Sequence, residues 1–145
     1  MQIEIKEMMI SDYHEAMSLW QQTEGMCLRV ADSREGIEAY LRRNPGLSFV
    51  ARSNGQLIGT VLCGHDGRRG YLHHLAVAHE HRGQGVGKKL TEQVIAALQQ
   101  NGIQKCHLFV LNENTKAIQY WQKRGWQHRH DIRMMSFVSS DDTHV

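Results

Sequence analysis

Arg82-Gly83-Gln84-Gly85-Val86-Gly87 is the stretch that decides the fold, because it joins an apolar strand segment, Leu72 to Val77, to an amphipathic helix. The helix repeats an apolar residue every four positions, at Val86, Leu90, Val94 and Leu98. Glycines let a ligand approach the backbone, and the first turn of a helix offers unpaired N–H groups at the positive end of its dipole. Arg82 adds a permanent cation. The stretch therefore predicts a site for a phosphate or pyrophosphate.

Two common phosphate loops fit this stretch poorly. In a nucleotide P-loop, a glycine would stand at Arg82 and a Mg²⁺-binding hydroxyl at Lys89, so ATP and GTP are disfavoured. A dinucleotide loop spaces its glycines as G-x-G-x-x-G and places an acidic residue about 20 positions on. Here the glycines stand at 83, 85 and 87, and residues 103–111 contain no Asp or Glu. NAD is therefore disfavoured as well.

The stretch resembles the signature of the GNAT N-acetyltransferase superfamily: Arg or Gln, two arbitrary residues, Gly, one arbitrary residue, then Gly or Ala. The family's loop holds the pyrophosphate of acetyl-coenzyme A. Asn114, Ala117 and Gly125-Trp126 resemble its second motif, and the resemblance covers residues 49–137. It implies an α/β fold with a GNAT-like mixed, mostly antiparallel sheet that has a central splayed parallel pair and is flanked by about four helices.

Local signals agree with that order of elements. Ser11 or Asp12 is expected to cap a first helix and Ser33 a second one, which ends before Pro45. Asn54-Gly55 predicts a hairpin turn. A long helix is expected to end at residues 101–102, and Asn114 to cap the last helix. The predicted strands lie near residues 3–5 and at 47–52, 57–63, 71–77, 106–111 and 132–138.

Size and composition indicate one domain. We expect residues 1–140 to form a single acetyl-CoA-binding N-acetyltransferase domain and residues 141–145 a polar tail. Charged residues within the first seven positions argue against a secretory segment, and no run of 18 apolar residues occurs. The three cysteines lack C-x-x-C spacing, as expected for free thiols. A cytoplasmic protein without membrane association is expected.

Nucleic acid and metals are not expected as partners. The formal net charge of +2 is too small to indicate a nucleic-acid surface. Histidines form close pairs such as His79 with His81, but no third ligand stands at a recognised spacing. No metal site is therefore predicted. A homodimer is one state that the resemblance allows, because related domains often pair.

The resemblance assigns acetyl-CoA contacts to the strand end, the loop and the last helix. Backbone groups of the strand end pair with the pantetheine arm, and the Val77 N–H faces the acetyl carbonyl as an oxyanion donor. For Lys88 and Lys89, solvated helix charges are the alternative to phosphate ligands. The implied residues are Leu75, Ala76, Val77, Arg82, Gly83, Gln84, Gly85, Val86, Gly87, Lys88, Asn114 and Trp121.

The implied reaction is direct transfer of the acetyl group to a primary amine of a small molecule, protein or peptide. Many family members protonate the leaving thiolate with a Tyr four residues before the second-motif Gly, where this chain has Trp121. Indole cannot act as that acid. The neighbouring Tyr120 is turned by about 100° on a helix, so it either reaches the sulfur or packs in the core. The missing phenol keeps open a non-catalytic acetyl-CoA-binding sensor or interaction module.

His73 and His74 are the candidate bases that deprotonate the amine, since they lie where some family members carry a Glu. Successive strand residues point to opposite faces, so at most one should face the cleft, and His73 aligns better. One alternative is a histidine satisfied by local hydrogen bonds, and another is attack by an amine that arrives deprotonated through water.

The acceptor is expected beside the loop between the first two helices. Glu24 or Asp32 would attract its ammonium, and Arg29 would hold a carboxylate. Solvated loop charges are the alternative interpretation.

Overall fold

The computed structural model describes residues 2–145. Contacts group them into two compact units, one reaching Leu108 and one formed by Phe109–Val145, and each is described by itself. The single domain expected over residues 1–140 stays a prediction.

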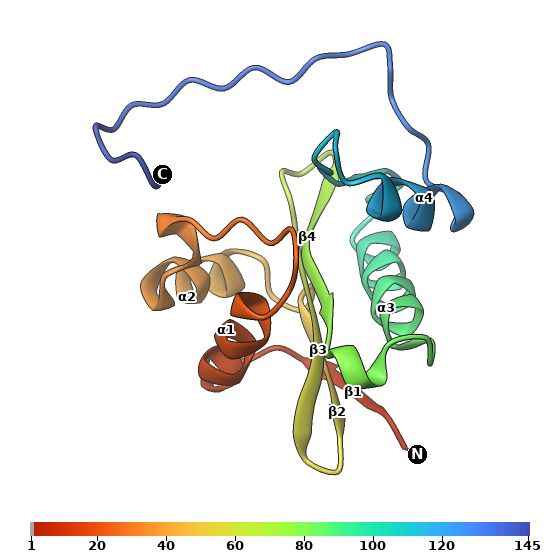
Figure 1. Cartoon of the computed structure of the whole chain (residues 1–145). Helices are drawn as coiled ribbons and strands as arrows, with labels where there is room; N and C mark the ends of the chain where they lie inside the picture. Colours follow the sequence, from red (N-terminus) through yellow and green to blue (C-terminus); the bar gives the residue numbers. More distant parts are fainter. Residues whose placement is uncertain (1) are drawn as a thin grey trace. The chain divides into compact units, whose positions relative to one another are not determined.

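The first unit is built on a five-stranded sheet of order β1-β2-β3-β4-β5 (Figure 1). Its strands are β1 (Glu4–Glu7), β2 (Phe49–Ser53), β3 (Gln56–His65), β4 (Gly70–Val77) and β5 (Cys106–His107). Neighbouring strands are antiparallel from β1 to β4, and β5 runs parallel to β4. The predicted α/β class and the mixed, mostly antiparallel sheet are confirmed.

The parallel pair lies at the end of this sheet and not at its centre. It is short, because β4 and β5 are in register only at Gly70 and Tyr71. The strand predicted for residues 106–111 is reduced to β5, and the one predicted for 132–138 is not formed. Apolar periodicity is not sufficient for a strand, since its backbone groups also need a hydrogen-bonded neighbour.

Two layers of helices cover the sheet of the first unit. Figure 1 shows α1 (Tyr13–Gln21) and α2 (Arg34–Arg43) on one face and α3 (Val86–Gln100) on the other. Short 3-10 turns precede α1 and α2 (η1, Ile10–Asp12; η2, Val30–Asp32), and a third follows β4 (η3, His79–His81). The second unit contains α4 (Thr115–Lys123).

The turn prediction and two of the capping predictions are confirmed, but the side chain of Asp12 at the start of α1 makes no capping hydrogen bond to that helix. The Ser33 hydroxyl accepts a hydrogen bond from the Gly36 N–H (3.0 Å), and the Asn114 amide oxygen accepts one from the Ala117 N–H (3.2 Å). Asn54 and Gly55 both have positive φ, +52° and +78°, as the two-residue turn between β2 and β3 requires.

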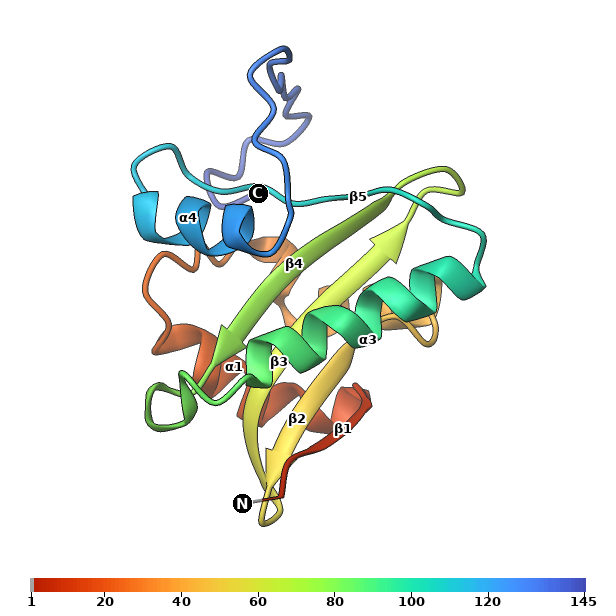
Figure 2. The same cartoon turned by 90° about the vertical axis from the view of Figure 1, so that its right-hand side faces the viewer.

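Helix α3 lies close against the sheet because two sheet positions that face it are glycines. A Cβ added at Gly59 would lie 3.1 Å from a Leu90 methyl carbon, and one added at Gly70 would lie 2.7 Å from a Leu98 methyl carbon. Figure 2 shows α3 running along the strands, with its N-terminus beside the end of β4. This packing fixes the glycine loop at the strand end.

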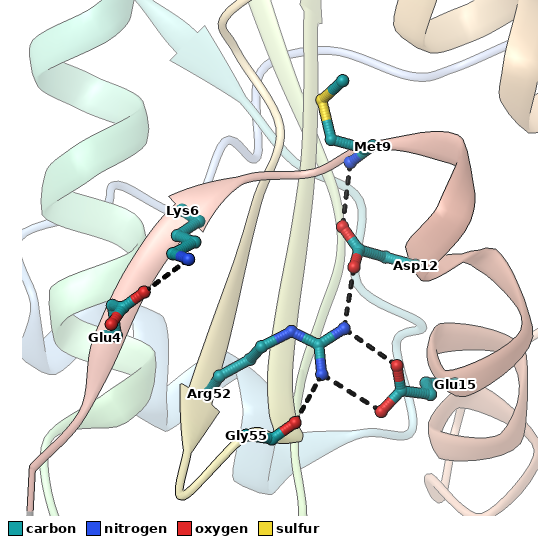
Figure 3. Close-up of polar contacts among 7 residues, drawn as sticks. All are labelled: Glu4, Lys6, Met9, Asp12, Glu15, Arg52 and Gly55. Atoms are coloured by element: carbon teal, nitrogen blue, oxygen red, sulfur yellow. Dashed lines mark hydrogen bonds and ion pairs between the residues drawn. The ribbon is translucent and has the colours of Figure 1, made fainter.

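Arg52 on β2 ties the start of α1 to the β2–β3 hairpin (Figure 3). Its guanidinium donates to Asp12 (2.7 Å), to both oxygens of Glu15 (2.8 and 3.2 Å) and to the Gly55 carbonyl (2.8 Å). Asp12 also accepts the Met9 N–H at 2.9 Å. Charge-assisted, two-pronged contacts of this kind are stronger than single surface ion pairs.

Replacing Arg52 with Met is expected to lower the free energy of unfolding by about 1–3 kcal/mol, because it removes the donor shared by two carboxylates. Hydrogen bonding from Arg52 holds the pKa of Glu15 below its usual value. The Glu15 contribution is therefore present above the usual glutamate pKa and is lost as the pH falls through the lowered one. Urea unfolding at neutral and acidic pH measures both effects. The exposed Arg133→Met is the control, and equal midpoints for the two variants would contradict the prediction.

Candidate active site

The glycine loop ends in a left-handed residue that starts α3. Gly85 caps the helix with φ +81°, and Gly83 has φ +77°. The first turn closes with a hydrogen bond from the Lys89 N–H to the Gly85 carbonyl (3.0 Å). The N–H groups of the preceding residues, 86–88, have no intrahelical acceptor, so they are available to an anion.

The end of β4 turns backbone groups of Val77 toward an open edge. The Ala78 N–H donates to the Ile58 carbonyl (2.8 Å). The neighbouring pair, Gly59 and Val77, is therefore a non-hydrogen-bonded pair of the antiparallel ladder, in which the two N–H groups point away from the partner strand. The Val77 N–H therefore points away from β3, on the side where β5 pairs only with Gly70 and Tyr71. Ala76, in contrast, is in register with Thr60 inside the ladder.

Arg82 links this strand end to the loop between α1 and α2. Its Nε donates to the Val77 carbonyl (3.0 Å), and its guanidinium lies 3.6 Å from the carboxylate of Glu24. The structure thus brings together three predicted site residues. Gln84 and Lys88 are exposed on the loop and on the first turn of α3.

A β-bulge places both candidate bases on the same face of the sheet. His73 is in register with Leu62 and Ala76 with Thr60, so β4 has one residue more than β3 between these pairs. His74 lies in the bulge with φ +50°, a value rare for residues other than glycine. The prediction that strand alternation separates the two rings is wrong. His73 contacts Tyr40 of α2 and His74 contacts Trp20 of α1, with ring centroids 6.3 and 4.8 Å apart.

His74 forms a pair with Asp32, the last residue of η2. Its Nε2 lies 2.7 Å from Asp32 Oδ1, and both side chains are largely buried. Asp32 Oδ2 accepts the Arg29 N–H (2.8 Å), which leaves both carboxylate oxygens engaged. Asp32 is therefore placed to orient His74. It is not the free loop carboxylate that the sequence suggested for attracting an ammonium.

The electrostatics of the pair favour a carboxylate that holds one tautomer of His74. Burial by itself raises the pKa of Asp32, but hydrogen bonds from His74 and from the Arg29 N–H outweigh it, so the net shift is downward. A carboxylate accepts only, and the Nε2–H tautomer satisfies it. Nδ1 then carries the lone pair, and it has no hydrogen-bond partner among residues 2–145. Burial and the neighbouring His74 lower the pKa of His73.

Two further side chains that sequence analysis did not single out contact this bulge. The Trp20 indole N–H donates to the Thr60 hydroxyl (2.9 Å), which in turn donates to the His74 carbonyl (2.9 Å). Trp20 and Thr60 are 1% and 0% exposed. The only hint in the sequence is a lone hydroxyl within the apolar segment 57–63.

The second unit carries three predicted site residues. Asn114 caps α4. Trp121 is buried, and its ring contacts those of Tyr120 and Trp126, with both centroids 5.1 Å away. The Arg124 guanidinium lies 3.9 Å from the centroid of the Tyr120 ring. The acetyl-CoA contacts of Asn114 and Trp121 and the acid role of Tyr120 stay predictions.

The remaining acceptor residues lie at the surface of the α1–α2 loop. Glu24 and Arg29 are exposed, and an Arg29 guanidinium nitrogen donates to the Leu28 carbonyl at 3.3 Å. Within residues 2–145, no cluster of three His, Cys, Asp or Glu side chains is arranged for a metal ion. In the same range no helix combines the length and apolarity needed to cross a membrane.

Comparison with known proteins shows the family of the chain. The family model described as "Acetyltransferase (GNAT) family" matches residues 12–126. A protein named as an acetyltransferase from Pectobacterium atrosepticum is 31% identical over 125 residues, which are 86% of this chain and 88% of that protein.

Solved structures show the same fold at lower identity. The PaiA N-acetyltransferase of Thermoplasma acidophilum, in complex with coenzyme A, has a TM-score of 0.73 at 20% identity, and the match covers 86% of this chain and 89% of that one. AAC(6')-Iy, in complex with the bisubstrate analogue CoA-S-monomethyl-acetylneamine, has a TM-score of 0.75 at 21% identity, with coverages of 97% and 99%.

Proposed function

Because the chain belongs to the GNAT acetyltransferase family, we propose that it transfers the acetyl group of acetyl-CoA to a primary amine of a small molecule, protein or peptide by direct attack. The observation that carries this proposal is the arrangement at the end of β4. There the open Val77 N–H, the glycine loop and the oriented His74 all belong to one short segment, residues 74–87.

The binding of acetyl-CoA is assigned to the backbone at this place. The loop N–H groups and the start of α3 take the pyrophosphate, and Arg82 adds positive charge beside it. At the open edge of β4, backbone groups of Leu75 and Val77 hydrogen-bond the pantetheine arm, in the way that they would pair with an additional strand. Val77 then donates its N–H to the acetyl oxygen, where negative charge develops during attack.

His74 is proposed as the general base, with Asp32 as its orienting partner. An alkylammonium has a pKa near about 10.4, so it must lose a proton before its nitrogen can attack. Nδ1 of His74 accepts that proton while Nε2–H stays on Asp32. The neutral amine then attacks the acetyl carbon, and the C–N bond forms. As the C–S bond breaks, the nitrogen gives up its second proton, and the leaving thiolate takes up a proton directly or through solvent. Burial lowers the pKa of His73, so His73 holds an accepted proton less readily than an ordinary imidazole and is the less suitable base.

The acceptor is assigned to the α1–α2 loop, which supplies Asp32 to the catalytic pair and brings Glu24 to the glycine loop. Both oxygens of Asp32 are engaged, whereas Glu24 is exposed and meets Arg82 only at 3.6 Å. Glu24 is therefore the carboxylate proposed to attract an ammonium, and Arg29 is the cation proposed for an acceptor carboxylate.

An assay of free thiol tests the function. Purified protein with acetyl-CoA is expected to release coenzyme A when a panel of primary amines is added, and mass spectrometry should find the matching acetylated amine. Calorimetry with coenzyme A provides the binding control. Binding without turnover across amino acids, peptides, polyamines and aminoglycosides would contradict the proposed transferase and support the non-catalytic module. Absence of binding would contradict both.

A further inference from the structure

The carbonyl of His74 is held by a buried hydrogen-bond relay that starts on α1. The indole N–H of Trp20 is a donor only, so it must give its proton to the Thr60 oxygen. The single hydroxyl proton of Thr60 is then directed to the His74 carbonyl at 2.9 Å. The polarity of this relay is therefore fixed, and it connects a helix, β3 and the bulge of β4.

We propose that Thr60 and Trp20 are positioning residues for His74: they hold the strained bulge so that its imidazole meets Asp32 and keeps Nδ1 free. The inference rests on the proposed function, because it concerns the base of that same site. Residues with positive φ outside glycine persist only when their surroundings over-determine them. Here the surroundings are the Thr60 hydroxyl on the backbone and the Asp32 carboxylate on the ring.

The bulge also decides which face His74 occupies. Without the extra residue, strand alternation would place His73 and His74 on opposite faces, and no ring at position 74 would reach η2. The groups that face His74 are Asp32 from η2, His73 on its own strand and the uncharged Trp20 from α1. Loss of the relay should therefore appear first in the orientation and tautomer of this one imidazole.

Nitrogen NMR of the histidine rings provides the test. The signal of His74 is identified by its absence in His74→Gln, and wild type is expected to show a protonated Nε2 and an unprotonated Nδ1. Thr60→Val keeps the side-chain shape but removes the hydroxyl, whereas Thr60→Ser retains it. In Thr60→Val we expect the His74 ring to populate both neutral tautomers. We expect kcat to fall about tenfold and the affinity for coenzyme A to stay unchanged. Thr60→Ser should restore the single tautomer and the wild-type kcat.

Trp20→Phe is the second variant, for the case that Thr60→Val does not fold. It removes the fixed donor to Thr60 but leaves the hydroxyl, so a smaller change of the His74 signals in the same direction is expected. The inference would be overturned if the His74 ring nitrogen signals were the same as in wild type in both variants, or in whichever of the two folds. The spectra do not depend on turnover, so an inactive wild type with an ordered Nε2–H tautomer would refute the proposed function alone.

Discussion

Asp32→Asn is expected to lower kcat/KM by on the order of 10²-fold or more while leaving the affinity for coenzyme A unchanged. The carboxylate accepts two hydrogen bonds, one from the Arg29 N–H and one from His74. An amide has only one oxygen. Because the backbone N–H can only donate, that oxygen must face Arg29, and the amide NH₂ then faces His74.

This arrangement reverses the tautomer of the base. An NH₂ group opposite Nε2 requires the lone pair there, so the proton of neutral His74 moves to Nδ1. The nitrogen proposed to accept the proton of the amine would then already carry one. Steady-state kinetics with acetyl-CoA and a responsive amine measure the loss, and nitrogen NMR of His74 should show the exchanged protonation.

Asp12→Asn is the matched control, because Asp12 closes η1 as Asp32 closes η2. It accepts a backbone N–H from Met9 with one oxygen and a hydrogen bond from Arg52 with the other. Both variants should lose stability, but only Asp32→Asn should lose turnover. Equal kcat/KM values for the two variants would show that Asp32 has no part in catalysis.

Gly85→Val is expected to weaken the binding of coenzyme A by at least about tenfold. A β-branched residue is strained at φ +81°, so the loop should leave the conformation that presents the N–H groups of residues 86–88. Calorimetry with coenzyme A measures the change. An added Cβ meets no atom within 4 Å, so the strain arises from the backbone and not from a clash.

Gly102→Val at the other end of α3 separates strain from binding. Gly102 has φ +78°, and an added Cβ there also meets no atom within 4 Å. Each of the two replacements should therefore lower the free energy of unfolding by about 1–2 kcal/mol. The affinity of Gly102→Val for coenzyme A should stay at the wild-type value. If both variants bind like wild type, the glycine loop is not the pyrophosphate site.

Much of the scaffold could be predicted from local patterns. Ser33 and Asn114 cap helices as expected, Asn54-Gly55 forms the hairpin, and the glycine loop joins β4 to α3. These signals act within a few residues, so they do not depend on the rest of the fold. The segment 132–138 shows the limit, because a strand also requires a partner that its own residues do not supply.

The sequence by itself determined the loop, the caps and the family, because each depends on residue types at fixed short spacings. The tertiary structure alone decided where the two histidines lie and which of them meets a carboxylate. The extra residue in β4 turned His74 to the face of α1, and Asp32, 42 positions away, came to hold it. Spacing along the chain cannot report such a pair, because it forms only where β4 and η2 come together in the folded chain.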